Sequence, residues 1–235
     1  MGWSEVFKIN SNLKKPLNKQ IQDMKFQPVR VITATGTYTP EKTGLYKIIC
    51  VGAGGNGYCG NSSYYGGASG GGGGVAIKTM TLSSSTNYSV TVNTGTASFA
   101  YSGGAITALP GGTPTSIYIT PDAIGVGGTA SGGDYNFTGE DGSYTGKNIA
   151  DIAPRPGSVG VFISDLSKPS YVVGHTFSSS YTGVPTIEYQ YGGSILGYGG
   201  GGTGASYYVS STNRGSHSKS GQPAAVIIVP MELEE

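Results

Sequence analysis

The sequence predicts a mainly β protein with a short N-terminal helical segment, and three observations support this. Glycine supplies 42 of the 235 residues, far above the ~7% that is usual in globular proteins. Charged residues make up only 11% of the chain. After residue 28 the other side chains are mostly Ser, Thr, Tyr, Val and Ile, which favour strands and turns. We therefore expect a helical segment over residues 1–28 and a glycine-rich β domain over residues 29–235.

Runs of β-branched and aromatic residues mark the strands that we expect in this domain. Residues 29–39 and 44–52 are predicted as two strands joined by the turn Pro-Glu-Lys-Thr-Gly. Residues 74–82 and 87–95 are predicted as a hairpin across the polar stretch Ser-Ser-Ser-Thr. Near the C-terminus, residues 224–229 are continuously apolar, which predicts a buried closing strand.

The first 28 residues carry a helical pattern. Four apolar residues are spaced by four, four and three positions, which places them on one face of a helix. Pro16 is compatible with its first turn. So narrow a face over about three turns cannot bury itself, so we expect an attachment or oligomerisation segment. The alternative is a helix that packs on its own globular domain. The residues expected to make the contact are Trp3, Phe7, Leu13, Leu17, Ile21 and Met24.

Long glycine-rich stretches separate the expected strands, and two arrangements account for them. They could be flexible linkers, which are usually built from Gly and Ser without aromatic residues. They could instead be packed polyglycine-II helices, which have three residues per turn and no internal hydrogen bonds. Backbones without Cβ atoms can approach closely enough to pair with one another. Tyr, Ile and Leu interrupt the stretches, which favours the packed arrangement.

Charge and hydropathy argue against two classes of partner. The formal net charge is +1, and nucleic-acid binding needs a basic surface, so we expect no nucleic-acid partner. No apolar run approaches the ~20 residues that cross a bilayer, so we expect no membrane insertion. The N-terminus lacks the apolar stretch of a signal peptide, so we expect no secretory leader.

One segment imitates a nucleotide-binding motif. Gly52, Gly54 and Gly57 match the G-x-G-x-x-G fingerprint directly after an expected strand. That fingerprint needs a helix from the last glycine and an acidic residue about 20 positions later. The sequence after Gly57 is rich in Gly and Ser, and no Asp or Glu lies between Glu41 and Asp122. We therefore expect no dinucleotide site.

A second segment resembles part of a calcium-binding loop. Asp134, Asn136, Thr138 and Gly139 fit its first positions, but Thr145 stands where a bidentate Glu is needed. A surface loop with aromatic and acidic residues is the better interpretation. We expect no metal and no cofactor.

The supply of catalytic side chains is small. The chain has two histidines and two cysteines, without the spacing of a zinc site. No G-x-S-x-G motif is present, so we expect no enzyme. Cys50 lies in an apolar strand and is predicted as a buried thiol; a Cys50–Cys59 disulfide is the alternative.

Tyrosine beside glycine and serine is the positive signal for binding. Tyr offers rigid, amphipathic contact area, and Ser, Gly and Asn offer adaptable hydrogen bonds, as in antibody recognition loops. The alternative is that the tyrosines cover the edges of a core that has few other side chains.

Several segments in a fixed order resemble a known family. They are TGTYTPEKTGLYKIICVGAGGNG, GGGGGVAIKTMTL, NYSVTVNTG, LPGGTPTSI, GYGGGGTGAS and GQPAAVIIVP. This order is similar to the glycine-rich domain of bacteriophage tail-fibre and tail-tip proteins, and in style to the polyglycine adhesins of T-even phages. The glycine blocks here are shorter and more interrupted than in those adhesins. The start, GWSEVFKINSNLKKPLNKQI, looks like that of tail-fibre proteins in phages of Gram-positive hosts.

The resemblance implies a receptor-binding protein of a phage tail or phage-tail-like particle, made in the bacterial cytoplasm and commonly a homotrimer. Its partners would be a glycan or protein receptor on the bacterial surface and, through residues 1–28, other tail or baseplate proteins. The candidate loops are 58–69, 96–107, 131–147, 176–194 and 205–219. The expected receptor-binding residues are Tyr64, Tyr65, Tyr135, Phe137, Tyr144, Tyr181, Tyr207 and Tyr208. A purely structural tail, baseplate or surface protein and a surface-polysaccharide hydrolase remain as alternatives.

Overall fold

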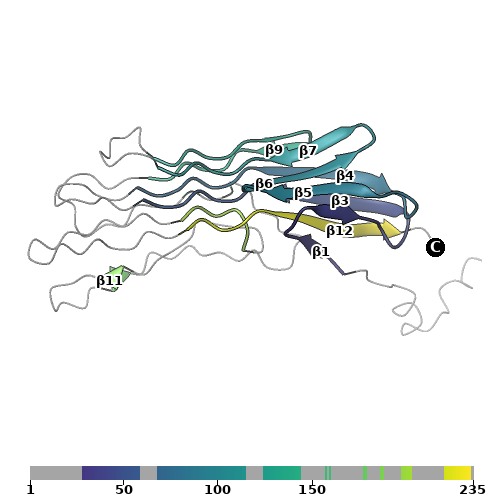
Figure 1. The fold of residues 1–235 in the computed structure, drawn as a ribbon, viewed down its shortest axis with the longest axis horizontal. Helices are drawn as coiled ribbons and strands as arrows, with labels where there is room; N and C mark the ends of the chain where they lie inside the picture. The colour runs from purple at the N-terminus through teal and green to yellow at the C-terminus, as the bar shows by residue number, and fades with distance from the viewer. Residues whose placement is uncertain are drawn as a thin grey trace, which may run out of the picture.

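The protein is mainly β, as the sequence predicts. The computed structural model describes residues 28–58, 68–114, 124–143, 157, 159, 177–178, 186–187, 197–202 and 220–233, and these residues contain no helix. Figure 1 shows an elongated body with two layers of strands at one end and extended, undulating segments at the other. The predicted N-terminal helix lies outside the described residues, together with its six proposed contact residues from Trp3 to Met24.

Two antiparallel sheets of five strands each form the layered end of the molecule. Sheet 1 has the order β1-β12-β3-β4-β9, and sheet 2 has the order β2-β5-β6-β7-β8. A separate pair joins β10 to β11. The strands are β1 (Arg30–Ile32), β2 (Gly36–Tyr38), β3 (Gly44–Val51), β4 (Val75–Leu82), β5 (Tyr88–Asn93), β6 (Thr96–Tyr101), β7 (Gly104–Ala108), β8 (Ala130–Ser131), β9 (Tyr135–Phe137), β10 (Phe177–Ser178), β11 (Thr186–Ile187) and β12 (Ala225–Leu233).

The single strand predicted over residues 29–39 is two strands in different sheets. β1 pairs with β12 in sheet 1, whereas β2 pairs with β5 in sheet 2. The chain bends between them, and the Thr35 hydroxyl exchanges hydrogen bonds with the backbone of Val92. Where the chain crosses between the sheets, these side-chain bonds take the place of backbone hydrogen bonds between strands. One continuous stretch of β-favouring residues therefore contributes a strand to each sheet.

The hairpin predicted across residues 83–86 is also wrong. β4 belongs to sheet 1 and β5 to sheet 2, so this stretch crosses between the layers. Leu82 before the crossing and Tyr88 after it both point into the core between the sheets. The Tyr88 hydroxyl accepts the amide of Ser83 at 2.9 Å. Burial of both strand ends in one core therefore decides the connection.

The tight hairpin lies one strand later, between β5 and β6. Asn93 pairs with Thr96, which leaves a two-residue turn of Thr94 and Gly95. Both turn residues have positive φ, 47° and 82°. This is the backbone of a type I′ turn, whose twist matches that of the flanking strands.

Apolar side chains from both sheets fill the space between them. Sheet 1 contributes mainly Tyr46, Ile48 and Cys50 of β3, Leu82 of β4 and Val226 and Ile228 of β12. Sheet 2 contributes mainly Tyr88, Val90, Ala97, Phe99, Ile106 and Ala108. The closing strand predicted at residues 224–229 is confirmed: β12 lies between β1 and β3, and its first residues are buried.

Cys50 is a free, fully buried thiol in this core. The predicted buried thiol is confirmed, and the alternative disulfide to Cys59 is wrong. Burial raises the pKa of the Cys50 thiol far above its ordinary value. The residue therefore acts as a small apolar side chain.

Candidate functional site

Extended segments continue from the strands of the sandwich and pack together as one body (Figure 1). We call this body the glycine array. It consists of residues 52–57, 69–74, 109–114, 124–129, 138–143, 157, 197–202 and 220–223, joined by backbone hydrogen bonds between segments far apart in sequence. Residues 68–76 are buried without a break. The array is therefore a core made of backbone.

The hydrogen bonds of segment 69–74 repeat every three residues. Residues three apart donate to the same neighbouring segment, so three neighbours share six amides. The bonds run from Ser69 to Ser143 and Gly72 to Glu140 (both 2.9 Å), from Gly70 to Gly202 (3.0 Å) and Gly73 to Gly199 (2.7 Å), and from Gly71 to Gly112 (3.1 Å) and Gly74 to Leu109 (3.0 Å). A three-residue turn with every bond made outward defines packed polyglycine-II helices.

The carbonyl oxygens of the same segment bind a second set of neighbours. Segment 124–129 donates to Ser69 and Gly72, and segment 52–57 donates to Gly71 and Gly74. Gly157 donates to Gly70 at 3.0 Å. Segment 69–74 is thus surrounded by six partners. The packed arrangement is confirmed for these residues, and the flexible-linker alternative is wrong for them.

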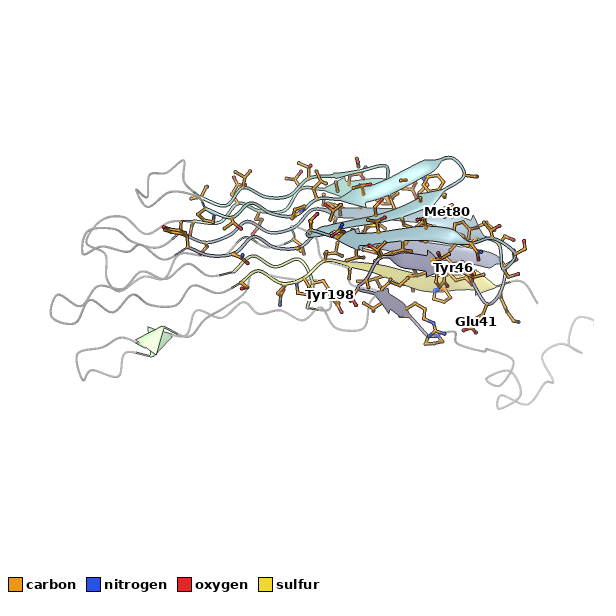
Figure 2. All side chains as sticks on the ribbon, in the orientation of Figure 1. Glu41, Tyr46, Met80 and Tyr198 are labelled. Carbon is orange, nitrogen blue, oxygen red and sulfur yellow. The ribbon has the colours of Figure 1, made fainter. Side chains whose placement is uncertain are left out.

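Close backbone contact explains why these positions are glycine. A Cβ atom on Gly54 would lie 2.0 Å from the carbonyl oxygen of Gly200, and one on Gly139 would lie 2.1 Å from that of Gly72. Such approaches are far inside van der Waals contact. In Figure 2 the side chains crowd around the two sheets and thin out along the array, with Tyr198 where the array meets sheet 1.

Polar side chains complete the hydrogen bonds at the margin of the array. The Asp141 carboxylate accepts the Gly127 amide at 2.7 Å, and the Asn56 side-chain oxygen accepts the Gly221 amide at 2.9 Å. Gln222 exchanges bonds with Gly200 through both its amide and its side-chain oxygen. These side chains thereby give backbone amides at the margin a hydrogen-bond partner.

The array ends on the side away from the sandwich, where its segments are paired in sequence. The chain passes outward along 52–57 and returns along 69–74, and it does the same along 109–114 and 124–129. Residues 138–143 lead outward before Gly157, and residues 197–202 lead outward before 220–223. Four connections, 59–67, 115–123, 144–156 and 203–219, therefore start and finish at one end, which we call the far end.

Comparison with protein families agrees with this architecture. The sequence model of a family described as a glycine-rich domain matches residues 32–226. The chain belongs to this glycine-rich domain family. The match begins at the last residue of β1 and ends within β12, so it covers the array and every strand from β2 to β11. No curated protein matches the sequence.

Two of the eight predicted receptor residues lie on a strand of the glycine-rich domain. Tyr135 and Phe137 belong to β9, at the edge of sheet 1, and not to a loop at the far end. Phe137 packs against the outer face of sheet 1, whereas the Tyr135 side chain is 65% exposed. The candidate loop 96–107 is also wrong, because it forms most of the hairpin of β6 and β7.

The other six predicted residues lie outside the described part of the chain. Five of them fall within the four connections that start and finish at the far end, namely Tyr64, Tyr65, Tyr144, Tyr207 and Tyr208. Tyr181 falls between β10 and β11. The list of candidate loops omitted 115–123, whose Tyr118 lies in a fourth connection of the same kind. The segment LPGGTPTSI directly before Tyr118 was assigned to the ordered segments shared with the tail-fibre family. The pairing of outward and returning array segments shows instead that residues 115–123 form a connection.

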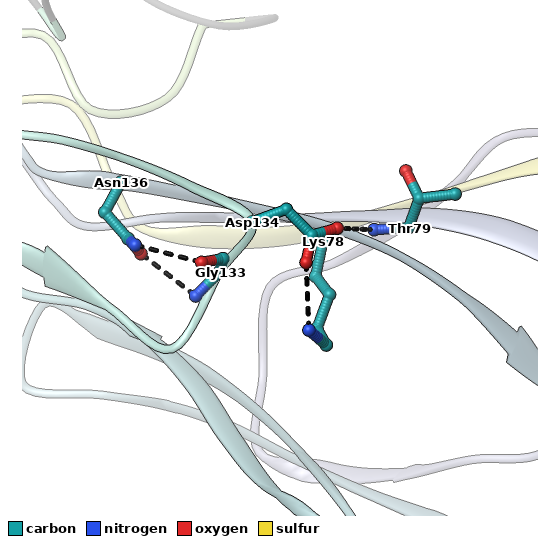
Figure 3. A network of polar contacts seen from close by, with 5 residues as sticks. All are labelled: Lys78, Thr79, Gly133, Asp134 and Asn136. Atoms are coloured by element: carbon teal, nitrogen blue, oxygen red, sulfur yellow. Dashed lines mark hydrogen bonds and ion pairs between the residues drawn. The ribbon is translucent and has the colours of Figure 1, made fainter.

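The polar residues of the calcium-like segment are engaged with the protein. Asp134 accepts the Lys78 ammonium at 3.0 Å and the Thr79 amide at 2.8 Å, and the Asn136 side chain bonds the backbone of Gly133 in both directions (Figure 3). The Thr79 and Lys78 bonds hold the pKa of Asp134 below its ordinary value, and the bond to Asp134 raises the pKa of Lys78. The side-chain oxygens of Asp134 and Asn136 thus serve to hold this turn and to join it to β4.

The nucleotide-like motif also has a packing role in the described residues. Gly52 and Gly54 of this motif lie in array segment 52–57 and pack against neighbouring backbone. Among the described residues, no three His, Cys, Asp or Glu side chains gather as metal ligands. The same part of the chain contains no helix long and apolar enough to span a membrane.

Proposed function

We propose that this chain is a tail-fibre or tail-tip protein of a phage or phage-tail-like particle and binds a receptor on the bacterial surface with its far end. The observation that supports this most is the geometry of the array. Four separate connections begin and end on one rigid, hydrogen-bonded base. Binding residues are often carried by loops that a rigid scaffold positions.

The composition of the four connections suits recognition. They hold Tyr64, Tyr65, Tyr118, Tyr144, Tyr207 and Tyr208 among many Ser, Thr, Gly and Asn residues. Tyrosine gives large contact area for little loss of conformational entropy, and small polar residues adapt to varied hydrogen-bonding groups. Such a surface suits a glycan or a protein on the cell exterior.

The N-terminal segment, residues 1–28, is proposed to attach the protein to other tail or baseplate proteins, with three copies in each assembly. Several copies on one particle would convert modest binding at each site into high avidity. A protein that only builds the particle, or a hydrolase of surface polysaccharide, would use the same scaffold differently.

Cell binding tests the proposal. The purified full-length protein, fluorescently labelled, is mixed with a panel of bacterial strains, and bound protein is counted by flow cytometry. We expect strain-selective binding that the double variant Tyr207→Ala/Tyr208→Ala loses. Tyr135→Ala is the matched control, because it removes an exposed tyrosine from the sandwich and should leave binding unchanged. Circular dichroism verifies that both variants remain folded.

Each alternative has its own outcome. Binding to none of the strains would favour a purely structural role. Equal loss in both variants would move the contact surface away from the far end. Release of reducing sugar ends from surface polysaccharide, absent with heat-unfolded protein, would favour the hydrolase.

A further inference from the structure

The outer face of sheet 1, which points away from sheet 2, carries an apolar row across all five strands. Paired residues on adjacent strands share a face. The register joins, in order, Val31, Ile227, Ile49, Ile77 and Tyr135. Ile227 and Ile49 in the middle are fully buried, whereas Val31 at one end is 41% exposed. This row is continuous with a buried apolar cluster but opens to solvent at the β1 edge.

Exposed apolar residues gather at that edge. Val29 is 42% exposed and Met231 is 49% exposed, and with Val31 they form what we call the apolar margin. Val29 precedes β1 by one residue, and Met231 lies on the adjacent strand β12, unpaired at the bulge where the register shifts between Pro230 and Glu232. Single exposed apolar residues are normal, but neighbouring ones along one sheet edge indicate a contact surface.

The N-terminal segment enters the domain at this margin. Residues 1–27 lie outside the described part of the chain, and Pro28 joins directly to Val29. Three residues, 25–27, separate the predicted helix from Pro28, and at most ~3.6 Å each they span about 11 Å. The apolar face of the predicted helix therefore starts within reach of the margin. So short a tether gives an effective concentration of the order of millimolar or higher.

Charge also favours this segment as the occupant. Residues 1–27 carry five lysines against Glu5 and Asp23, a net charge of +3. The C-terminal end of β12 holds Glu232, and Glu234 and Glu235 follow it. Opposite charges therefore accompany the two apolar surfaces.

We propose that residues 13–24 form a helix whose face of Leu13, Leu17, Ile21 and Met24 packs on the apolar margin of the same copy of the chain. Trp3 and Phe7 remain ahead of the docked helix, where they are free for the proposed attachment to a particle. The docked helix would hold the attachment residues at a fixed angle to the sandwich. This role requires no receptor, so it stands apart from cell binding.

A matched pair of variants tests the docking in the full-length protein. Leu17→Asp/Ile21→Asp places two charges on the apolar face of the helix. Asn18→Asp/Gln22→Asp adds the same charges one position along, which turns them by ~100° away from Leu17 and Ile21 and off the apolar face. Hydrogen–deuterium exchange is followed in peptides covering residues 28–32 and 226–233.

We expect the first variant to exchange at least tenfold faster over residues 28–32 and to melt several degrees lower, while the second behaves like the parent. Met231→Asp, which changes the margin instead of the helix, should reproduce the first result. Thr37→Asp on the exposed face of sheet 2 is its control. Strain-selective binding should survive in all four, which separates this proposal from the receptor site.

Two results would overturn the proposal. The first is equal exchange in both helix variants, which would mean that the helix does not cover the margin. The second is protection over residues 28–32 that disappears on dilution as the sedimentation coefficient falls, since the occupant would then be another copy of the chain.

Discussion

A Cβ atom on Gly71 would lie 2.2 Å from the carbonyl oxygen of Val126, in a segment 55 positions further along the chain. The obstacle is backbone, so no side-chain rotation can relieve it. We predict that Gly71→Ala destabilises the protein by about 3 kcal/mol or more, the upper end of the range for overpacked cores. Urea unfolding followed by near-ultraviolet circular dichroism measures this change.

Gly36→Ala is the matched control for that substitution. Gly36 lies in β2, and a Cβ there would meet no atom within 4 Å. The control should stay within about 0.5 kcal/mol of the parent, as most surface substitutions do. Similar midpoints for the two variants would show that the array yields easily, and would contradict a tightly packed backbone core.

The array shows what sequence could and could not predict. Interrupted glycine blocks indicated packed backbones, because aromatic residues are unusual in flexible linkers. The partners could not be predicted, because Gly70 bonds Gly202 and Gly72 bonds Glu140 across long stretches of chain. The hydrogen bonds repeat every three residues but go to three segments that are distant in the sequence, so the sequence near segment 69–74 does not indicate its partners.

The strands show a similar division. The β-branched and aromatic runs predicted the positions of β3, β4, β5 and β12 but not their assignment to sheets, and β6 and β7 lie in a segment that was expected as a loop. Leu82 and Tyr88 both face the common core, so the chain crosses layers where polar turn residues suggested a hairpin. Thr94 adopts a positive φ of 47° beside Gly95. A non-glycine residue in this conformation is uncommon, so the two-residue turn was hard to predict.

Asp134 ties β4 to the turn before β9, and its removal is the second prediction. The carboxylate accepts the amide of Thr79 and the ammonium of Lys78. Asp134→Ala leaves that amide without its partner, so we expect a loss of about 1 kcal/mol. Glu41→Ala, which breaks the exposed ion pair with Arg30, should cost much less because exposed pairs contribute little.

The pH dependence of this effect has a definite sign. The folded-state pKa of Asp134 lies below its ordinary value, so its contribution is present above the ordinary pKa and fades as the pH falls through the lowered one. The stability difference between the parent and Asp134→Ala should therefore shrink in acid. A difference that grows on acidification would contradict the assignment.

For the candidate site, composition identified the tyrosines but not their grouping. Tyr135 and Phe137 lie in a glycine-containing stretch, but they form an edge strand, because Tyr135 pairs with Ile77. Tyr118 was missed because it directly follows LPGGTPTSI, which was assigned to the ordered segments of the family resemblance and not to a loop. Only the pairing of outward and returning array segments distinguishes the two groups.

Cys50 gives the third prediction. Its thiol is fully buried, and burial raises its pKa, so both access and ionisation oppose reaction. In a Cys59→Ser background, we expect no reaction with a disulfide reagent at neutral pH until urea unfolds the protein. The reagent then reports the opening of the core. Rapid labelling under native conditions would show that the sandwich opens easily near β3.

Tyr38 gives the fourth prediction. Burial, with smaller contributions from neighbouring Tyr46 and Glu41, raises the pKa of Tyr38 to about 12, although Arg30 acts in the opposite direction. A raised pKa means that the folded state holds the phenol proton more tightly than the unfolded chain does. The stability from this group is complete below the ordinary pKa of 10.0 and is lost as the pH rises towards 12.

Comparison with Tyr38→Phe isolates this contribution. The parent should lose stability more steeply than the variant between pH 10 and 12, and its absorbance titration should contain one late phenol step that the variant lacks. Tyr88→Phe serves as a control for the loss of a hydroxyl, because it removes a bond to Ser83 that does not depend on that titration. If Tyr38→Phe keeps the late step, the step belongs to another tyrosine, and Tyr46 is the first to examine because burial raises its pKa too.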